Sequence, residues 1–234
     1  MPLGVKKILA IVPARGGSKG VARKNIRELG GKPLLEWTLN AALNSDFIDK
    51  VVVSTECCEI ANVAINFGID IPFMRPQHLS RDDTTVADVV EHVLTSLDEQ
   101  YEEVVLLQPT SPFRSSAHIT DALRAYCKLD ARSLVSVCQA EKSPYWMFTI
   151  SEDRLLKPLL TNEKLVNRRQ DLPAFYQLNG AIYVVNVSLF LKKKKFVYSD
   201  TVPYVMDHAS SLDIDTLVDF QMAEAMLAAN DQGA

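Results

Sequence analysis

The sequence predicts an α/β protein in which helices cover both faces of a doubly wound, mostly parallel sheet. Two observations lead to this fold class. Short apolar runs rich in β-branched residues alternate along the chain with segments whose apolar residues recur at helical spacing. The strand-like runs are also apolar at nearly every position, which is typical of strands that are buried on both faces.

The first part of the chain supports this class element by element. Apolar runs predict buried strands at residues 8–12, 51–54, 104–107 and 134–137. Helical spacing predicts helices at residues 34–43, 59–67, 84–97 and 116–129. Gly68 follows the second of these helices, and glycine readily adopts the left-handed conformation that ends many helices.

The regular alternation stops after Ala140. Residues 141–178 contain three prolines at positions 144, 158 and 173, so we expect this stretch to leave the sheet as irregular strands. A further strand is expected at residues 181–185, and a last helix at residues 216–229. A chain of 234 residues is long enough to bury one substantial core, so we expect a single domain over residues 1–234 with a small excursion.

Composition limits the possible partners. A formal net charge of −4 indicates no general affinity for nucleic acid, so a partner that carries phosphates needs a local cluster of cations. No apolar run approaches the roughly 20 residues of a membrane helix, and the run at residues 8–12 is too short for a signal peptide. Four cysteines without CxxC spacing favour free thiols, and hence a cytoplasmic protein.

A glycine-rich, basic turn follows the first expected strand. Open α/β sheets bind ligands beyond the carboxyl ends of their strands, and three glycines in residues 13–20 let backbone N–H groups approach an anion closely. Arg15 and Lys24 can add charge-assisted bonds to phosphate oxygens. The glycine spacing fits neither a Walker A loop nor a dinucleotide fingerprint. A solvated surface turn is the alternative, which the strand before the turn and the helix after it make less favourable.

Several sequence blocks together resemble one enzyme family. In chain order they are PARGGSKG (13–20), RKN (23–25), GKPL (31–34), LQPTSPFR (107–114), RRQDLP (168–173), NGAIY (179–183) and DID (213–215). In this order they resemble the acylneuraminate cytidylyltransferases, the CMP-sialic acid synthetases, over nearly the whole chain. The resemblance implies a Rossmann-like nucleotidyltransferase that transfers CMP from CTP to the C2 hydroxyl of a nonulosonic (sialic-type) acid and releases pyrophosphate.

The resemblance also assigns a nucleotide side to the site. The residues that it implies are Arg15, Gly16, Gly17, Ser18, Lys24, Asn25 and Arg75. Arg15 and Lys24 would bind the triphosphate and act as catalytic cations, because such transfers depend on positioning and charge neutralisation. Arg75 would read the cytosine edge. Without the resemblance, Arg75 would be interpreted as a plain surface arginine before a proline.

A pair of carboxylates suggests a metal. Asp213 and Asp215 are two residues apart, which places both on one face of an extended segment. Hard oxygen ligands suit Mg²⁺, which often bridges phosphates. The resemblance implies that the pair is catalytic and holds Mg²⁺. Asp215 also precedes a helical run and could be its N-cap, and one residue pair could serve both purposes.

On the sugar side, the resemblance implies Gln108, Arg169, Asn179, Trp146 and Phe196. Arg169 would bind the sugar carboxylate through its bidentate fork. The amides of Gln108 and Asn179 suit hydroxyl or N-acyl groups, although Gln108 could equally tie down its own loop.

Further expectations concern the excursion and two departures from the family pattern. The stretch at about 141–200 resembles the family's dimerisation region, which implies a homodimer in which Phe196 crosses the interface. Where some relatives place a substrate-binding lysine, this chain has Tyr145 and Trp146, so Trp146 would pack on an N-acyl or deoxy region such as that of legionaminic acid. Glu56 stands where relatives usually have aspartate.

Other functions compete with this interpretation. The alternatives are a CMP-legionaminate synthetase, a Kdo-type or sugar 1-phosphate cytidylyltransferase, and a nucleotide-binding sensor without turnover. The blocks between Arg169 and Tyr183 argue against the Kdo-type and sugar 1-phosphate enzymes. The presence of both Asp213 and Asp215 argues against a sensor.

Overall fold

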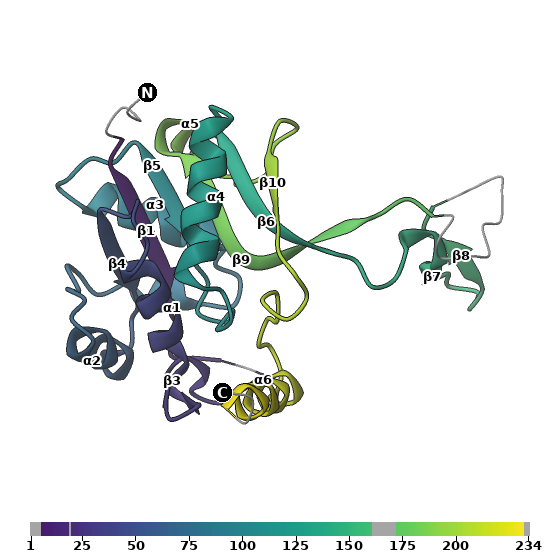
Figure 1. The fold of residues 1–234 in the computed structure, drawn as a ribbon, viewed down its shortest axis with the longest axis horizontal. Helices are drawn as coiled ribbons and strands as arrows, with labels where there is room; N and C mark the ends of the chain where they lie inside the picture. The colour runs from purple at the N-terminus through teal and green to yellow at the C-terminus, as the bar shows by residue number, and fades with distance from the viewer. Residues whose placement is uncertain (1–5, 19, 161–171, 232–234) are drawn as a thin grey trace.

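A mixed sheet of six strands forms the centre of the computed structural model, which describes residues 6–18, 20–160 and 172–231 (Figure 1). The strand order is β10-β6-β9-β5-β1-β4. Strand β1 pairs in parallel with β4 and β5, and β10 pairs in parallel with β6. Only β9 in this sheet runs antiparallel to its neighbours, β5 and β6. The strands are β1 Ile8–Pro13, β4 Lys50–Ser54, β5 Glu103–Leu106, β6 Ser133–Gln139, β9 Tyr176–Asn186 and β10 Val202–Val205.

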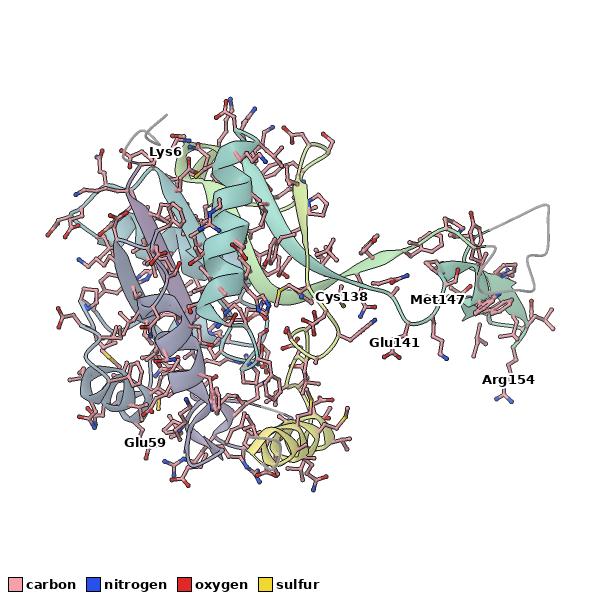
Figure 2. The ribbon with its side chains drawn as sticks, viewed as in Figure 1. Lys6, Glu59, Cys138, Glu141, Met147 and Arg154 are labelled. Atoms are coloured by element: carbon pink, nitrogen blue, oxygen red, sulfur yellow. The ribbon has the colours of Figure 1, made fainter. Side chains whose placement is uncertain are left out.

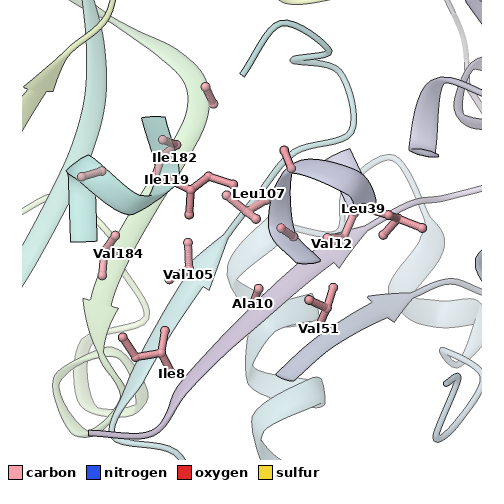
Figure 3. Packing of buried hydrophobic residues seen from close by; sticks show 14 of the residues in the cluster. Ile8, Ala10, Val12, Leu39, Val51, Val105, Leu107, Ile119, Ile182 and Val184 are labelled. Atoms are coloured by element: carbon pink, nitrogen blue, oxygen red, sulfur yellow. The ribbon is translucent and has the colours of Figure 1, made fainter. Parts of the chain in front are cut away.

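Helices cover both faces of this sheet, as the sequence predicts. Alternate residues of β1 explain why. Ala10 packs into the core beneath α1 and α4 (Figure 3). Ile11 packs into the core beneath α3 and α5. Both cores are buried, so β1 needs apolar residues at every position. The helices are α1 Leu34–Leu43, α2 Cys58–Asn66, α3 Val86–Ser96, α4 Ser116–Lys128, α5 Val187–Lys193 and α6 Leu217–Asp231. None of the helices in the described ranges is long and apolar enough to cross a membrane.

The strands and helices predicted up to residue 137 are confirmed, and their observed ends lie within two residues of the predicted ends. The later part differs more. The strand expected at 181–185 is longer and antiparallel, and the sequence prediction missed both α5 and β10. The remaining short elements are η1 Lys24–Ile26, β2 Glu28–Leu29, β3 Lys32–Pro33, η2 Gln77–Ser80 and η3 Pro144–Trp146.

The expected excursion is a projecting arm. Strands β6 and β9 continue as a ribbon beyond the body, and the ribbon leads to a hairpin of β7 Phe148–Ile150 and β8 Leu156–Pro158 (Figures 1 and 2). Met147 and Arg154 mark the far end of this arm in Figure 2. Residues 187–200 return to the body, where α5 packs against the sheet.

Candidate active site

A cleft of about 520 Å³ lies beyond the carboxyl ends of β1 and β5. We call it the main cleft. The turn after β1, the loop of residues 75–86 and the segment after β5 line it. Of the residues predicted for the nucleotide side, it is lined by Arg15, Ser18, Lys24, Asn25 and Arg75, together with Gln108 and Asp215. The structure thus brings together residues that are up to 200 positions apart in the sequence.

Internal hydrogen bonds shape the glycine-rich turn. Asn25 is buried, and its Nδ2 donates to the backbone oxygen of Arg15 at 2.9 Å. The N–H of Gly16 donates to Glu56 Oε1 at 2.8 Å, and a Cβ on Gly16 would lie 3.0 Å from the Cβ of Cys57. Gly16 and Gly17 do not line the main cleft. In the structure Gly16 sets the path of the turn through its bond to Glu56, and its contact with a nucleotide stays a prediction.

Arg15 is the more exposed of the two predicted cations. Its Nη1 pairs with Asp82 Oδ1 at 3.0 Å, and both side chains are well exposed. An exposed ion pair contributes at most about 1 kcal/mol to stability, so the guanidinium can exchange this partner for an anion in the cleft.

Lys24 joins the turn to the carboxylate segment. Its Nζ donates to the backbone oxygen of Ile214 at 2.6 Å and to Asp215 Oδ1 at 3.1 Å. Ile214 is fully buried in a small core with Val21 and Phe220 of α6, which holds the segment in place. The turn after β1 and the segment before α6 therefore form one wall of the main cleft.

Arg75 is not a surface residue. Only 5% of it is exposed, its Nη2 donates to Glu56 Oε2 at 2.7 Å, and its Nε donates to Ser80 Oγ at 3.1 Å. Burial would raise the pKa of the Glu56 carboxyl, but the hydrogen bonds from Arg75 and Gly16 outweigh burial and hold that pKa below its ordinary value. The structure excludes the alternative of a plain surface arginine.

The two carboxylates of the predicted metal pair differ in environment. Asp215 is 74% exposed at the side chain, whereas Asp213 Oδ1 is buried and makes no hydrogen bond of ordinary geometry in the described part of the chain. Burial raises the pKa of the Asp213 carboxyl, and the charge of Asp215 raises it further, against the lowering effects of Thr110 and Lys24.

Capping does not occupy the carboxylate of Asp215. Thr216 caps α6: its hydroxyl accepts from the N–H of Asp219 at 3.3 Å, and Asp219 Oδ2 accepts from the N–H of Thr216 at 2.7 Å. Asp215 only donates its own backbone N–H to Asp219. The alternative of an N-cap at Asp215 is therefore wrong, because capping of α6 uses the carboxylate of neither Asp213 nor Asp215.

A second pocket of about 390 Å³ adjoins the main cleft and shares Gln108 with it. We call it the side pocket. Gly180 has a φ of +75°, and a Cβ there would lie 3.3 Å from Gln108 Oε1 and 3.6 Å from Asp213 Oδ2. The Gln108 amide and the Asp213 carboxylate thus both lie next to the backbone of Gly180. Burial raises the pKa of the Tyr183 hydroxyl, which also lines this pocket, and Asp213 adds to the increase.

Asn179 lines the side pocket, but its amide is fully used within the chain. Its Oδ1 accepts from Ser136 Oγ at 2.6 Å and from the N–H of Ala181 at 3.2 Å, while its Nδ2 donates to Ser211 Oγ at 2.8 Å and to Met206 Sδ at 3.4 Å. The predicted sugar contact is therefore corrected to a positioning role, in which Asn179 fixes β9 against β6 and the segment before Asp213.

Phe196 and Trp146, two other predicted sugar residues, do not line the side pocket. Phe196 is 8% exposed and packs against Tyr183 and Phe190 in the core, because its ring fills the space under α5. Within its own chain Phe196 is therefore a core residue, and its place at a dimer interface stays a prediction. Trp146 lies on the arm and lines neither pocket of its own chain. Arg169 lies outside the described residues.

The sequence prediction missed Arg114. This arginine is buried, and its Nη1 donates to the backbone oxygens of Gln108 and Ala181 at 3.0 Å each, while its Nη2 donates to Thr38 Oγ1 at 2.6 Å. Burial lowers its pKa. Arg114 fixes the backbone of Gln108 at the border of the two pockets. The only signal in the sequence was an arginine at the end of the LQPTSPFR block.

Comparisons with known proteins identify the family of this chain. The profile of the Cytidylyltransferase family matches residues 9–231. The CMP-N,N'-diacetyllegionaminic acid synthase of Legionella pneumophila is 36% identical over 231 residues, which cover 97% of this chain and 98% of that protein. The N-acylneuraminate cytidylyltransferases of Escherichia coli and Streptococcus agalactiae are each 38% identical over 93% and 92% of this chain. The chain spans only about half of those two proteins (51% and 52%).

Solved structures share the fold at low identity. A CMP:2-keto-3-deoxy-manno-octonic acid synthetase complexed with CTP matches 96% of this chain and 99% of its own, with a TM-score of 0.73 and 15% identity. The 4-diphosphocytidyl-2C-methyl-D-erythritol synthase of Anaerococcus prevotii matches 97% of this chain and 98% of its own, with a TM-score of 0.68 and 18% identity. The profile match over most of the chain and the 36–38% identity to curated relatives establish that this chain belongs to the cytidylyltransferase family.

Proposed function

We propose that this cytidylyltransferase transfers CMP from CTP to the C2 hydroxyl of a nonulosonic acid and releases pyrophosphate. One observation carries the proposal: the main cleft and the side pocket share Gln108, with Asp215 lining the first and Asp213 lining the second. A nucleotide and a second, polar substrate can therefore meet at the carboxylate pair. The relatives named for legionaminic and acylneuraminic acid supply the substrate class.

The residues of the main cleft suit the charge changes of this reaction. Attack of the C2 hydroxyl on the α-phosphorus moves negative charge onto the leaving pyrophosphate, so cations near the β- and γ-phosphates lower the barrier. Arg15 can leave its exposed pair with Asp82 for the triphosphate. Lys24 is held at one wall, where its ammonium group neutralises charge without needing to move.

The carboxylate pair fits Mg²⁺. The buried Oδ1 of Asp213 has no hydrogen-bond partner among the described residues, and the carboxylate of Asp215 is largely exposed. Those residues contain no group of three or more His, Cys, Asp or Glu side chains suited to a metal, so phosphate oxygens and water would complete the ligands. Such sharing is typical of Mg²⁺. When bound, Mg²⁺ would neutralise charge on the phosphate oxygens.

For the sugar, we propose the side pocket. Its Gln108 amide and Tyr183 hydroxyl can bind hydroxyl or N-acyl groups. Arg169 remains our proposed partner for the sugar carboxylate, because a guanidinium binds a carboxylate through two parallel hydrogen bonds.

We also propose a homodimer that forms through the arm. In the hairpin, Phe148 faces Pro158 and Ile150 faces Leu156, so these four residues share one face. Ile150 is 73% exposed and Leu156 is 67% exposed. An apolar face on a projecting hairpin is costly to leave in water, and a second copy of the chain offers the same face as a partner.

The four cysteines are all free thiols. Free thiols persist in a reducing compartment, and we therefore propose that the enzyme acts in the cytoplasm. Its nucleotide substrate, CTP, would be supplied there.

A pyrophosphate-release assay tests the proposal. Purified protein is incubated with Mg²⁺, one nucleoside triphosphate and one sugar acid: N-acetylneuraminate, legionaminate, pseudaminate or Kdo. We expect release that requires CTP, Mg²⁺ and a nine-carbon acid. Release with Kdo alone would move the assignment to the eight-carbon class. No release with any acid would refute the proposed reaction.

A further inference from the structure

One side chain joins the two halves of the main cleft. Glu56 accepts from the N–H of Gly16 through Oε1 at 2.8 Å and from Arg75 Nη2 through Oε2 at 2.7 Å. Gly16 belongs to the turn after β1, and Arg75 lines the cleft from the loop after α2. The ion pair is buried, with 3% of the Arg75 side chain and 11% of the Glu56 side chain exposed. A buried pair of this kind is costly to break, because removal of one partner leaves the other charge uncompensated.

These bonds fix the orientation of Arg75. Its Nη2 is held by Glu56, its Nε by Ser80, and its backbone N–H donates to the oxygen of Thr55 at 2.8 Å. A guanidinium is planar, so two anchored nitrogens set the direction of all its N–H groups. Arg75 can therefore present hydrogen-bond donors to the cleft in one fixed direction.

A fixed donor can select between pyrimidines. The pairing edge of cytosine carries two adjacent acceptors, N3 and O2, whereas uracil has a donor N–H at N3. An arginine that offers only donors is attracted by the first edge and opposed by the second. Discrimination of this kind is strongest when the protein group cannot turn away.

We propose that Glu56 is a positioning residue that couples selection of the cytosine base to the shape of the phosphate-binding turn. This inference rests on the proposed function for the identity of the nucleotide. Because the Glu56 carboxylate bonds both groups, a shift of Arg75 moves the turn at Gly16, and a shift of the turn moves Arg75. A base that displaces Arg75 would also disturb the turn that receives the phosphates.

The chemistry of the two partners explains why a glutamate at position 56 suits this arrangement. Both Gly16 and Arg75 donate, so position 56 must supply two acceptors that point in different directions. Glutamine offers one acceptor and one donor, and its NH₂ would face an N–H. Aspartate keeps the charge but is shorter by one C–C bond of about 1.5 Å. An aspartate at this position would therefore lengthen at least one of the two hydrogen bonds.

Calorimetric binding of CTP and of UTP, without sugar, tests the coupling. We compare the unmodified protein with Glu56→Gln, Glu56→Asp and the control Glu99→Gln, which removes a carboxylate from the exposed pair with Lys50. We expect the ratio of the UTP and CTP dissociation constants to fall about tenfold in Glu56→Gln and less in Glu56→Asp. The control should keep the ratio. If Glu56 acts through Arg75, Glu56→Gln should change the ratio no further when added to Arg75→Gln.

Two results would overturn the inference. Equal losses of CTP and UTP affinity in both Glu56 variants, with an unchanged ratio, would mean that Glu56 is only structural. An unmodified protein that binds CTP and UTP equally would mean that Arg75 selects no base. Both results concern binding alone, so they are independent of whether any sugar acid is turned over. Glu56→Asp keeps the charge of the buried pair and so provides a folded variant if Glu56→Gln unfolds.

Discussion

Gly20 lies directly against the backbone oxygen of Asp215: a Cβ on Gly20 would be 2.0 Å from that oxygen. This contact sets the distance between the turn after β1 and the carboxylate pair. Neither segment can approach closer, and any side chain at position 20 would push them apart. The relative position of the two proposed groups, phosphate-binding turn and metal carboxylates, therefore depends on a glycine.

Gly20→Ala should displace the segment of Asp215. We expect the free energy of unfolding to fall by about 2 kcal/mol, as for other overpacked sites, and turnover to fall with it. Gly17→Ala is the matched comparison, because a Cβ there would meet nothing within 4 Å, and its loss should be much smaller. Urea unfolding and the pyrophosphate assay measure both. Equal effects of the two substitutions would contradict the contact.

Asp215→Ala separates binding from chemistry. Asp215 is exposed and, within the described part of the chain, its side chain pairs with the partly buried Lys24, so its removal should leave the fold and most CTP affinity intact. Turnover should fall by about 100-fold or more if the carboxylate holds the metal. Calorimetry with CTP and initial rates over a range of Mg²⁺ concentration measure the two effects. Asp121→Ala, at an exposed pair on α4, is the control. Unchanged turnover in Asp215→Ala would exclude the metal role.

Arg114→Lys should destabilise the border between the two pockets. In Arg114 two separate nitrogens bond these acceptors: Nη1 bonds two backbone oxygens and Nη2 bonds a hydroxyl. A lysine has all three of its donors on one nitrogen, so it cannot reach the same acceptors in the same geometry, and the groups that lose their bonds are buried. We expect a loss of about 2 kcal/mol in the free energy of unfolding. Arg124→Lys, on the exposed surface of α4, should change it by less than about 0.5 kcal/mol. Similar losses in both variants would show that the buried bonds are not stabilising.

Ile150→Glu should dissociate the proposed dimer. The substitution places a charge in the apolar face of the hairpin, where burial against a second copy would cost several kcal/mol. Thr149→Glu adds the same charge to the opposite face of the same strand and should leave the dimer intact. Light scattering after size exclusion gives the two masses. A dimer that survives Ile150→Glu would show that this face is not the interface.

Much of the fold could be predicted because burial on both faces leaves a local signal. The apolar run at residues 8–12 indicates β1 without any tertiary information. The direction of β9 has no such signal, since an antiparallel strand between two buried neighbours is equally apolar. Strand β10 was hidden because it lies at the sheet edge, where Pro203 is tolerated and alternate residues are exposed.

Site residues could be predicted from the sequence where the charge or functional group of the side chain itself indicates the role. They could not be predicted where the role depends on a partner that is distant in the sequence. Lys24 and Asp215 were identified from charge and motif, and they meet in the structure. The burial of Arg75 depends on Glu56, which lies 19 residues away in another segment, so no local pattern revealed it. Asn179 suited a sugar by its amide, but only the tertiary structure shows that its own chain uses every hydrogen bond of that amide.

Phosphorus NMR of the complete reaction tests the central claim most directly. CTP, Mg²⁺ and a nine-carbon 2-keto sugar acid are incubated with the protein, and the phosphorus signals are followed over time. We predict that the three signals of CTP are replaced by one phosphodiester signal of a CMP-sugar and one signal of pyrophosphate, in equal molar amounts. Persistence of the CTP signals with every nine-carbon acid, or conversion to free CMP without a phosphodiester, would contradict the account.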